Sequence, residues 1–345
     1  MAARPKHKYD YIVLALQGGG ALGAYQAGVF EAMADLDLAP NWVAGVSIGA
    51  INGALITGNA VGHRCDRLRE FWDLVSSGVP VSAPTFFDPW HTAFNQTSAL
   101  LSATFGVPGL YSPRLPPPQL MPDGSPGAMS VYDTSPLRAT LERMVDFKLL
   151  NRSEVVRYSA GATNVATGNS QYFDNARERI DANHVMASSA LPPAFPAVEI
   201  KGQSYWDGGL VSNTPLWYVL DDSPGLEGLI VQVDLFSARG ELPRNLDQVM
   251  ERQKDITYSS KTRLNTTLVK DMALAPKKSK CRIDLVHLIN RRHSYTTSSK
   301  DYEFSRATVN QLWEAGRDKA RRTFAHLGTL KGRTSSDGMR VFDVL

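Results

Sequence analysis

The sequence predicts an α/β fold in which helices cover a parallel sheet. Two short apolar runs, residues 11–16 and 42–46, are typical of buried strands, and a helix-like stretch follows each, at residues 21–36 and 48–56. Strands and helices that alternate at this spacing usually form parallel strands joined by crossover helices. The chain has 345 residues, of which 43% are hydrophobic and 21% charged, so it is long enough to bury a sizeable core.

The later elements follow from the same periodicities. We expect helices at residues 67–75, 137–144 and 183–189, and strands at residues 155–165, 170–174 and 228–233. Two long amphipathic helices, residues 245–273 and 302–324, flank a further strand at residues 282–288. The pattern predicts one domain over residues 1–238 and a basic, mostly helical extension over residues 239–345 that packs on the same domain.

Residues 76–130 interrupt this regular pattern. They hold ten of the twenty prolines and several aromatic residues, among them Trp90 and Phe105. Loops of this length inside a compact domain usually have a function, and disordered segments are poor in aromatic residues. Two interpretations stand for this insertion: a lid or wall of a binding site, or a segment that covers an apolar flank of the sheet.

Composition restricts the class of protein. The only cysteines, Cys65 and Cys281, lie far apart, which argues against a disulfide scaffold or a zinc site. The polar N-terminus resembles no signal peptide, and no apolar run approaches the roughly 18 residues of a membrane span. We therefore expect a cytoplasmic protein.

The net charge of +3 is unevenly distributed. Residues 239–333 hold 21 Lys and Arg against 10 Asp and Glu, so the rest of the chain is acidic. Because these charges are mixed with acids, the excess suits solvated helix faces, and it also suits a surface that contacts anionic lipid. We expect transient, peripheral contact with an anionic membrane and no nucleic-acid partner.

Ser47 lies in the motif Gly45-Val46-Ser47-Ile48-Gly49, at the turn between a predicted strand and a predicted helix. Glycines on both sides leave room for a strained turn that exposes the serine oxygen, and the amino end of the following helix favours a developing oxyanion. Serine at this position could also be an ordinary helix cap. In this context we identify Ser47 as the nucleophile of an acyl-transfer enzyme.

The segment Gly18-Gly19-Gly20-Ala21-Leu22-Gly23 follows the first strand. It matches the dinucleotide-binding pattern, but that pattern needs an acidic residue at the end of the second strand, where this chain has Ser47. The lysine of a phosphate-binding loop is also absent. Consecutive glycine amides can instead form an oxyanion hole, which we assign to Gly18, Gly19 and Gly20.

A nucleophilic serine also needs a base. A Ser-His-Asp triad would draw on one of the seven histidines, of which His287 and His293 are the best candidates. Asp207, in the run Tyr205-Trp206-Asp207-Gly208-Gly209, offers a second solution because it ends a predicted strand at a glycine turn. An ordinary aspartate is a weak base, so this dyad needs partial desolvation and a short hydrogen bond to Ser47.

Together these motifs resemble the patatin-like phospholipase family over roughly residues 10–235. The resemblance includes the two glycine motifs, Asp207-Gly208-Gly209, the run Ala187-Ser188-Ser189-Ala190-Leu191-Pro192, and Asn213 and Pro215. It implies a three-layer α/β/α sandwich with a mainly parallel sheet and a patatin-like catalytic domain over residues 1–238.

The family likeness also implies a chemistry. Ser47 would be the nucleophile and Asp207 its proton acceptor, with the hole around Gly18 to Gly20 and supporting turns at Gly23, Gly45, Gly49, Gly208 and Gly209. The substrates would be acyl esters of lipids, cleaved without a metal or cofactor. Many members carry Arg or Lys where this chain has Leu22, which favours a neutral ester over a phospholipid. A non-catalytic lipid- or partner-binding protein of the same fold remains the alternative.

Overall fold

The fold was analysed in a computed structural model, which describes residues 9–79, 88–222, 228–273, 282–291, 297–329 and 338–343. The N-terminal residues 1–8, Cys281 and the candidate base His293 lie outside these ranges, as do residues 80–87 of the predicted insertion. Within the described part of the chain, no helix has the length and hydropathy required to cross a bilayer.

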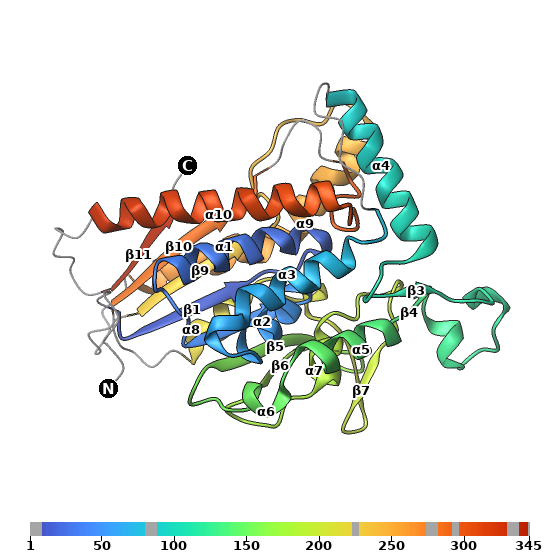
Figure 1. Ribbon diagram of the computed structural model, residues 1–345, viewed down its shortest axis with the longest axis horizontal. Helices are drawn as coiled ribbons and strands as arrows, with labels where there is room; N and C mark the ends of the chain where they lie inside the picture. The colour runs from blue at the N-terminus through green and yellow to red at the C-terminus, as the bar shows by residue number, and fades with distance from the viewer. Residues whose placement is uncertain are drawn as a thin grey trace.

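Nine strands of the described chain form one sheet (Figure 1). Six of them are mutually parallel, in the order β11 (Gly338–Asp343), β10 (Arg282–Ile289), β9 (Gly228–Asp234), β1 (Tyr11–Leu16), β2 (Trp42–Val46) and β5 (Arg157–Asn164). Strands β1, β2 and β9 are buried along their whole length, which explains why they could be recognised as continuous apolar runs. Strand β11 was not predicted.

The other strands are antiparallel to β5 or to each other. They are β6 (Ser170–Asp174), which pairs with β5, and the hairpin of β7 (Val198–Ile200) and β8 (Gln203–Asp207), which joins β5 through β8. Sequence periodicity predicted β6 and the end of β8 but not β7, which is only three residues long. This mixed part of the sheet delivers Asp207 to the site described below.

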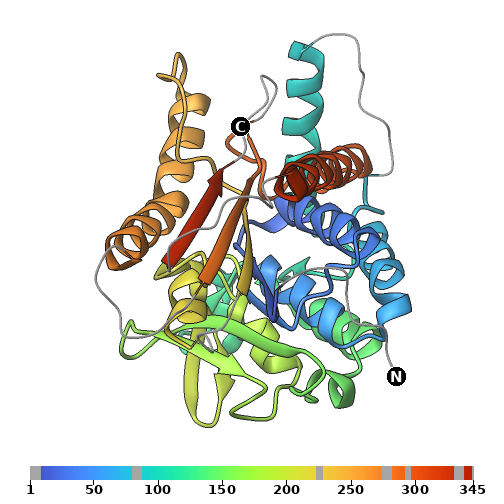
Figure 2. The ribbon, with the colours of Figure 1, turned by 90° about the vertical axis from the view of Figure 1, so that its left-hand side faces the viewer.

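Helices cover both faces of the sheet. On one face Ile12, Leu14 and Leu16 of β1 pack in a core with α1 (Ala24–Asp35), α2 (Ile48–Thr57), α3 (Arg64–Val75) and α10 (Arg306–Thr329). On the other face Val13 and Ala15 pack with α8 (Leu216–Asp221), and α9 (Leu246–Ala273) lies on the same side (Figure 2). The alternation along β1 thus separates two cores, and the predicted three-layer α/β/α arrangement is confirmed.

Helices α1 and α10 touch through their backbones. A Cβ atom on Gly28 would lie 1.9 Å from the carbonyl oxygen of Trp313, and one on Gly316 would lie 2.1 Å from that of Tyr25. Only glycine permits so close a crossing. The segment after residue 238 therefore supplies two outer strands of the sheet and a helix packed against the first helix of the chain.

Smaller elements surround the site. The expected helices at residues 137–144 and 183–189 are α5 (Ser135–Met144) and α7 (Ala182–Ser188), and α6 (Phe147–Leu150) lies between them in sequence. The predicted insertion contains a helix that periodicity missed, α4 (Asp88–Phe105), and a two-stranded ribbon of β3 (Ser112–Pro113) and β4 (Tyr132–Asp133). Figure 1 shows α4 and the segment between β3 and β4 projecting at the same end of the molecule.

Candidate active site

Strand β5 brings Ser47 and Asp207 together. Both β2 and β8 pair with the edge of β5 opposite β6, β2 with its first half and β8 with its second. Val46, the last residue of β2, pairs with Gly161, and Asp207, the last residue of β8, pairs with Ala162. The two strands run in opposite directions and meet at consecutive residues of β5. Ser47 therefore leaves β2 at the point where β8 ends.

Ser47 forms a strained elbow between β2 and α2. Its φ of 55° and ψ of −124° are rare for a residue with a side chain and cost about 1–3 kcal/mol. The turn is tight: a Cβ on Gly45 would lie 2.2 Å from the Gly49 carbonyl oxygen. The Ser47 amide donates to the carbonyl and hydroxyl oxygens of Ser188, at 3.1 and 3.0 Å, and the Ser188 hydroxyl donates to the Gly161 carbonyl. These bonds hold the elbow against α7 and β5.

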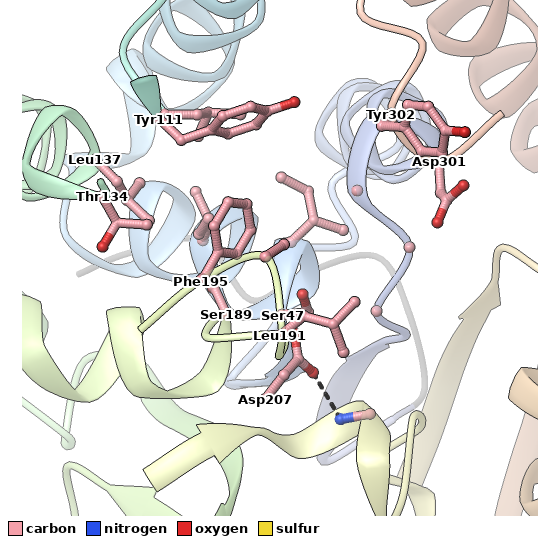
Figure 3. A pocket seen from close by; sticks show the side chains of 18 of the residues that line it. Ser47, Tyr111, Thr134, Leu137, Ser189, Leu191, Phe195, Asp207, Asp301 and Tyr302 are labelled. Atoms are coloured by element: carbon pink, nitrogen blue, oxygen red, sulfur yellow. Dashed lines mark hydrogen bonds between the residues drawn. The ribbon is translucent and has the colours of Figure 1, made fainter. Parts of the chain in front are cut away.

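Asp207 is almost completely buried, with 2% of its surface exposed. Burial raises its pKa from the ordinary 3.8 to about 6, although hydrogen bonds from the Ser47 hydroxyl and the Gly209 amide partly offset that rise. The Gly209 amide donates at 2.7 Å, and Figure 3 shows this bond with Ser47 next to the carboxylate. Asp207 is thus a better base near neutral pH than an exposed aspartate, as the predicted dyad requires.

The remaining motif glycines allow close approaches around these two residues. A Cβ on Gly208 would lie 2.4 Å from the Gly161 carbonyl oxygen, and one on Gly209 2.8 Å from the Asn213 side chain. A Cβ on Gly49 would lie 2.4 Å from the Leu16 carbonyl oxygen, and a Cβ on Gly23 would lie 2.4 Å from the Ile48 side chain. Each predicted supporting glycine therefore lies where the backbone or a buried side chain leaves no room for a methyl group.

The glycine loop after β1 lies beside Ser47, but its first amide is already occupied. The Gly18 amide donates to the Asn213 carbonyl oxygen at 3.1 Å, and the Asn213 side chain donates back to the Gly18 carbonyl at 3.0 Å. Neither the Gly19 nor the Gly20 amide donates to any residue that the structure describes. Of the three amides that the sequence assigned to an oxyanion hole, that of Gly18 is therefore engaged by Asn213, whereas those of Gly19 and Gly20 have no acceptor among the described residues.

A loop from the C-terminal segment holds the glycine loop from outside. The carbonyl oxygen of Asp301 accepts a hydrogen bond from the Ala21 amide at 2.8 Å, and a Cβ on Gly20 would lie only 2.0 Å from that oxygen. Lys254 of α9 in turn donates to the Asp301 carboxylate at 2.6 Å and to the Ser298 carbonyl at 2.7 Å. Nothing in the sequence indicated this contact, because it joins three segments by backbone and ion-pair geometry.

Ser47 and Asp207 open into a cavity of about 370 Å³. Figure 3 shows Tyr111, Thr134 and Leu137 on one side of it and Asp301 and Tyr302 on the other. The walls are largely apolar and aromatic, and no Lys or Arg of the described chain contributes to them. Such a cavity suits the hydrocarbon part of a ligand.

The histidine alternative is not supported for His287, the one of its two candidates that the structure describes. His287 lies on β10, which is separated from β2 by β9 and β1. Three strand spacings place it roughly 14 Å from Ser47 across the sheet. No described histidine lines the cavity. A triad through His287 is therefore excluded by the strand order.

The charge argument drawn from Leu22 does not apply to this cavity. It is buried with 3% exposure and packs in the main core, so it does not line the cavity. Its neutrality therefore says nothing about the charge that a substrate meets beside Ser47. The ionisable acidic residues that line the cavity in the described chain are Asp207 and Asp301, and the sequence singled out only the first.

Comparison with known proteins gives the family of this sequence. A family model described as patatin-like phospholipase matches residues 14–220, and a second one described as patatin phospholipase matches residues 270–335. None of the curated proteins matches the chain. The second family match lies beyond the part of the sequence in which motifs could be recognised.

Similar solved structures include VipD from Legionella pneumophila, with 15% identity and a TM-score of 0.43. The match covers 91% of this chain and 66% of the VipD chain. The human GIVD cytosolic phospholipase A2 is 12% identical, with a TM-score of 0.44. That match covers 93% of this chain and 60% of the phospholipase chain. The chain thus spans less than two thirds of the length of either protein.

Proposed function

Because this chain belongs to the patatin-like phospholipase family, we propose that it is a serine hydrolase that cleaves acyl esters of lipids with a Ser47–Asp207 dyad. The observation that carries the proposal is that a strained serine and a buried carboxylate with a raised pKa line the same largely apolar cavity. A fold of this family without catalysis would not need the elbow strain.

The reaction begins when the Ser47 hydroxyl attacks the ester carbonyl carbon and its proton passes to the Asp207 carboxylate. The carbonyl oxygen becomes an oxyanion, which the Gly19 and Gly20 amides and the amino end of α2 stabilise. Collapse of the tetrahedral intermediate releases the alcohol, which takes the proton from Asp207, and leaves an acyl group on Ser47. Asp207 then takes a proton from water, and the resulting attack releases the fatty acid and restores the serine.

Two effects make this dyad adequate without histidine. The pKa of about 6 brings Asp207 nearer to the ideal for a general base at neutral pH than an ordinary aspartate. Each amide of an oxyanion hole contributes about 3 kcal/mol of transition-state stabilisation. The hydrogen bond from the Ala21 amide to the Asp301 carbonyl oxygen holds the loop before the substrate arrives, so little reorganisation is needed during the reaction.

The cavity supports an acyl chain as the group that is bound beside Ser47. Tyr111, Tyr132 and Phe195 form a cluster of rings with centroids 4.6 to 6.1 Å apart, and Leu137 and Ile51 add aliphatic walls. Without Lys or Arg among the described lining residues, the cavity suits a neutral ester group more than a phosphate. A phospholipid would keep its phosphate outside.

The experiment that tests the proposal is covalent labelling with a fluorophosphonate, which reacts with activated serines. We expect one label per chain, carried by Ser47 and absent from the Ser47→Ala variant. The competing function, a lipid- or partner-binding protein that does not catalyse, predicts no label in either protein. A label that persists in Ser47→Ala would place the reactive serine elsewhere and overturn the assignment.

Contact with a membrane through the basic C-terminal segment was an expectation from charge alone. In the structure, several of its cations are used in ion pairs: Lys254 with Asp301, Lys300 with Asp255, Arg306 with Asp73, Arg321 with Asp35, and Arg340 with Asp284. These pairs reduce the field that an anionic membrane would meet. A peripheral location at a membrane is therefore proposed from the lipid substrate rather than from this segment.

A further inference from the structure

Helix α4 buries polar side chains and exposes large apolar ones, which is the reverse of the usual arrangement. Its buried positions are mostly small and polar: Asn95, Ser98 and Ser102 are each at most 7% exposed. Its exposed positions include Trp90, Leu100 and Phe105, with 68%, 65% and 73% exposure. Helices on the surface of a globular domain normally bury the apolar stripe. This reversed pattern is the reason that sequence periodicity did not reveal the helix.

The exposed large apolar residues of this region lie on α4 and on the segment after β3. Trp90, Leu101 and Phe105 lie within about 60° of one another around the axis of α4, and Leu100 lies about 80° from Trp90. Leu115 and Leu120 are exposed in the segment after β3. We call these six residues the apolar face. Between Pro89 and Pro122 the sequence contains a single Lys, Arg, Asp or Glu, which is Arg114. Large apolar side chains that are exposed together on one region of a protein are typical of a contact surface.

The apolar face continues into the cavity at Ser47. A groove beside the cavity is lined by Leu101 and Phe105 of the apolar face and by Tyr111 and Phe304, and the last two also line the cavity itself. Ala103 of the same helix lines the cavity, and the Tyr132 hydroxyl anchors it by donating to the Ala103 carbonyl at 2.7 Å. An apolar path therefore leads from exposed side chains to the nucleophile.

We propose that the apolar face docks on an electrically neutral lipid surface and that the groove beside α4 passes an acyl chain to Ser47. This inference rests on the proposed function and adds the surface from which the substrate comes. The continuity with the cavity favours lipid over a second protein, because a protein interface usually has a charged or polar rim around its apolar centre. Trp90 is also of the residue type that prefers the boundary between headgroups and hydrocarbon.

Vesicle binding tests the proposal without turnover if Ser47→Ala is the parent protein. Its partition onto phosphatidylcholine vesicles is measured by sedimentation at about 0.1 and 0.5 M salt. The double variant Trp90→Glu/Leu100→Glu adds two charges to the apolar face at positions that line neither the groove nor the cavity. We expect it to bind at least about tenfold more weakly, because charged groups are poorly tolerated at an apolar lipid boundary. Binding of the parent should change little with salt.

The matched control is Val61→Glu. Val61 is 71% exposed and follows α2, which runs from Ser47 to the opposite end of the sheet, so this variant should bind as the parent does. Unchanged binding of the double variant would overturn the proposal. So would binding that disappears at high salt, which would point to the basic segment, or a dimer that the double variant dissociates, which would make a second copy the occupant.

A second measurement separates this proposal from the proposed function. In the background with Ser47 intact, Trp90→Glu/Leu100→Glu should hydrolyse a soluble short-chain ester at the parental rate and an ester embedded in vesicles at least about tenfold more slowly. If neither protein hydrolyses any ester but the vesicle-binding difference persists, docking stands and catalysis fails. Equal loss on both substrates would refute a role confined to docking.

Discussion

Val46 and Asp207 pair with consecutive residues of β5, Gly161 and Ala162, although they come from strands that run in opposite directions. This relationship fixes the distance between Ser47 and Asp207 through a backbone ladder rather than through a flexible loop. The Thr163 hydroxyl adds to it by donating to the Asp207 carbonyl at 2.9 Å. A catalytic pair built on strand ends is held more accurately than one on loops.

Removal of either member of this pair should abolish hydrolysis. We expect Ser47→Ala and Asp207→Asn each to lower kcat for a p-nitrophenyl acyl ester by at least about a thousandfold. Catalytic residues that act as a unit are interdependent, so the loss of either one removes most of the rate enhancement. Circular dichroism and thermal melting should show a folded protein in both cases. Asp66→Asn, which changes an exposed carboxylate, serves as the control. Activity near the parental level in either variant would contradict the assignment of Ser47 and Asp207 as a catalytic dyad.

The pH profile should follow the carboxylate of Asp207. Its pKa of about 6 in the folded protein predicts that kcat/KM falls below about pH 6 as the base becomes protonated, and reaches a plateau above it. If the base were an exposed aspartate, kcat/KM would stay on its plateau down to about pH 4. The measurement is kcat/KM between pH 4 and 8 with a substrate that does not titrate. A fall in kcat/KM with its midpoint near about pH 4 would contradict the claim that burial raises the pKa of Asp207.

The same carboxylate should cost stability near neutral pH. Because its pKa is higher in the folded protein than in the unfolded chain, the folded state binds more protons between about pH 4 and 6, and the free energy of unfolding falls as the pH rises through that window. A difference of about two pKa units corresponds to about 3 kcal/mol. Asp207→Asn should therefore be more stable than the parent above pH 6, and the gain should vanish below pH 4. Urea unfolding at both pH values measures it.

The fold was predictable where burial leaves a trace in the sequence. Strands β1, β2 and β9 are buried at every residue, so continuous apolar runs revealed them, and the elbow at Ser47 was visible as glycines around a serine. The reversed pattern of α4 misled periodicity, because its exposed side is the apolar one. The part played by Asn213 in occupying the Gly18 amide, and that of Asp301 at Gly20, depend on contacts between distant segments. Composition and spacing contain no record of these.

Glycine at the crossing of α1 and α10 should matter for stability rather than for catalysis. Gly28→Ala would place a methyl group 1.9 Å from the Trp313 carbonyl oxygen, so the helices must separate, and we expect a loss of about 3 kcal/mol in the free energy of unfolding. The control is Gly62→Ala, where nothing lies within 4 Å and the change should be within about 0.5 kcal/mol. Denaturant unfolding compares the two. Equal effects at both sites would mean that the close crossing does not exist in solution.

Lys254 should influence the rate through the glycine loop, although it lines no part of the cavity. Its ion pair with Asp301 holds the carbonyl that binds the Ala21 amide, next to the two amides assigned to the oxyanion hole. We expect Lys254→Met to lower kcat about tenfold with little change in KM, because the loop stabilises the transition state rather than the bound substrate. Lys254→Arg, which keeps the charge, should recover part of the rate. Lys201→Met, which removes an exposed lysine paired with Glu178, should leave both constants unchanged. A rise in KM at constant kcat for Lys254→Met would assign Lys254 to substrate binding instead of loop positioning.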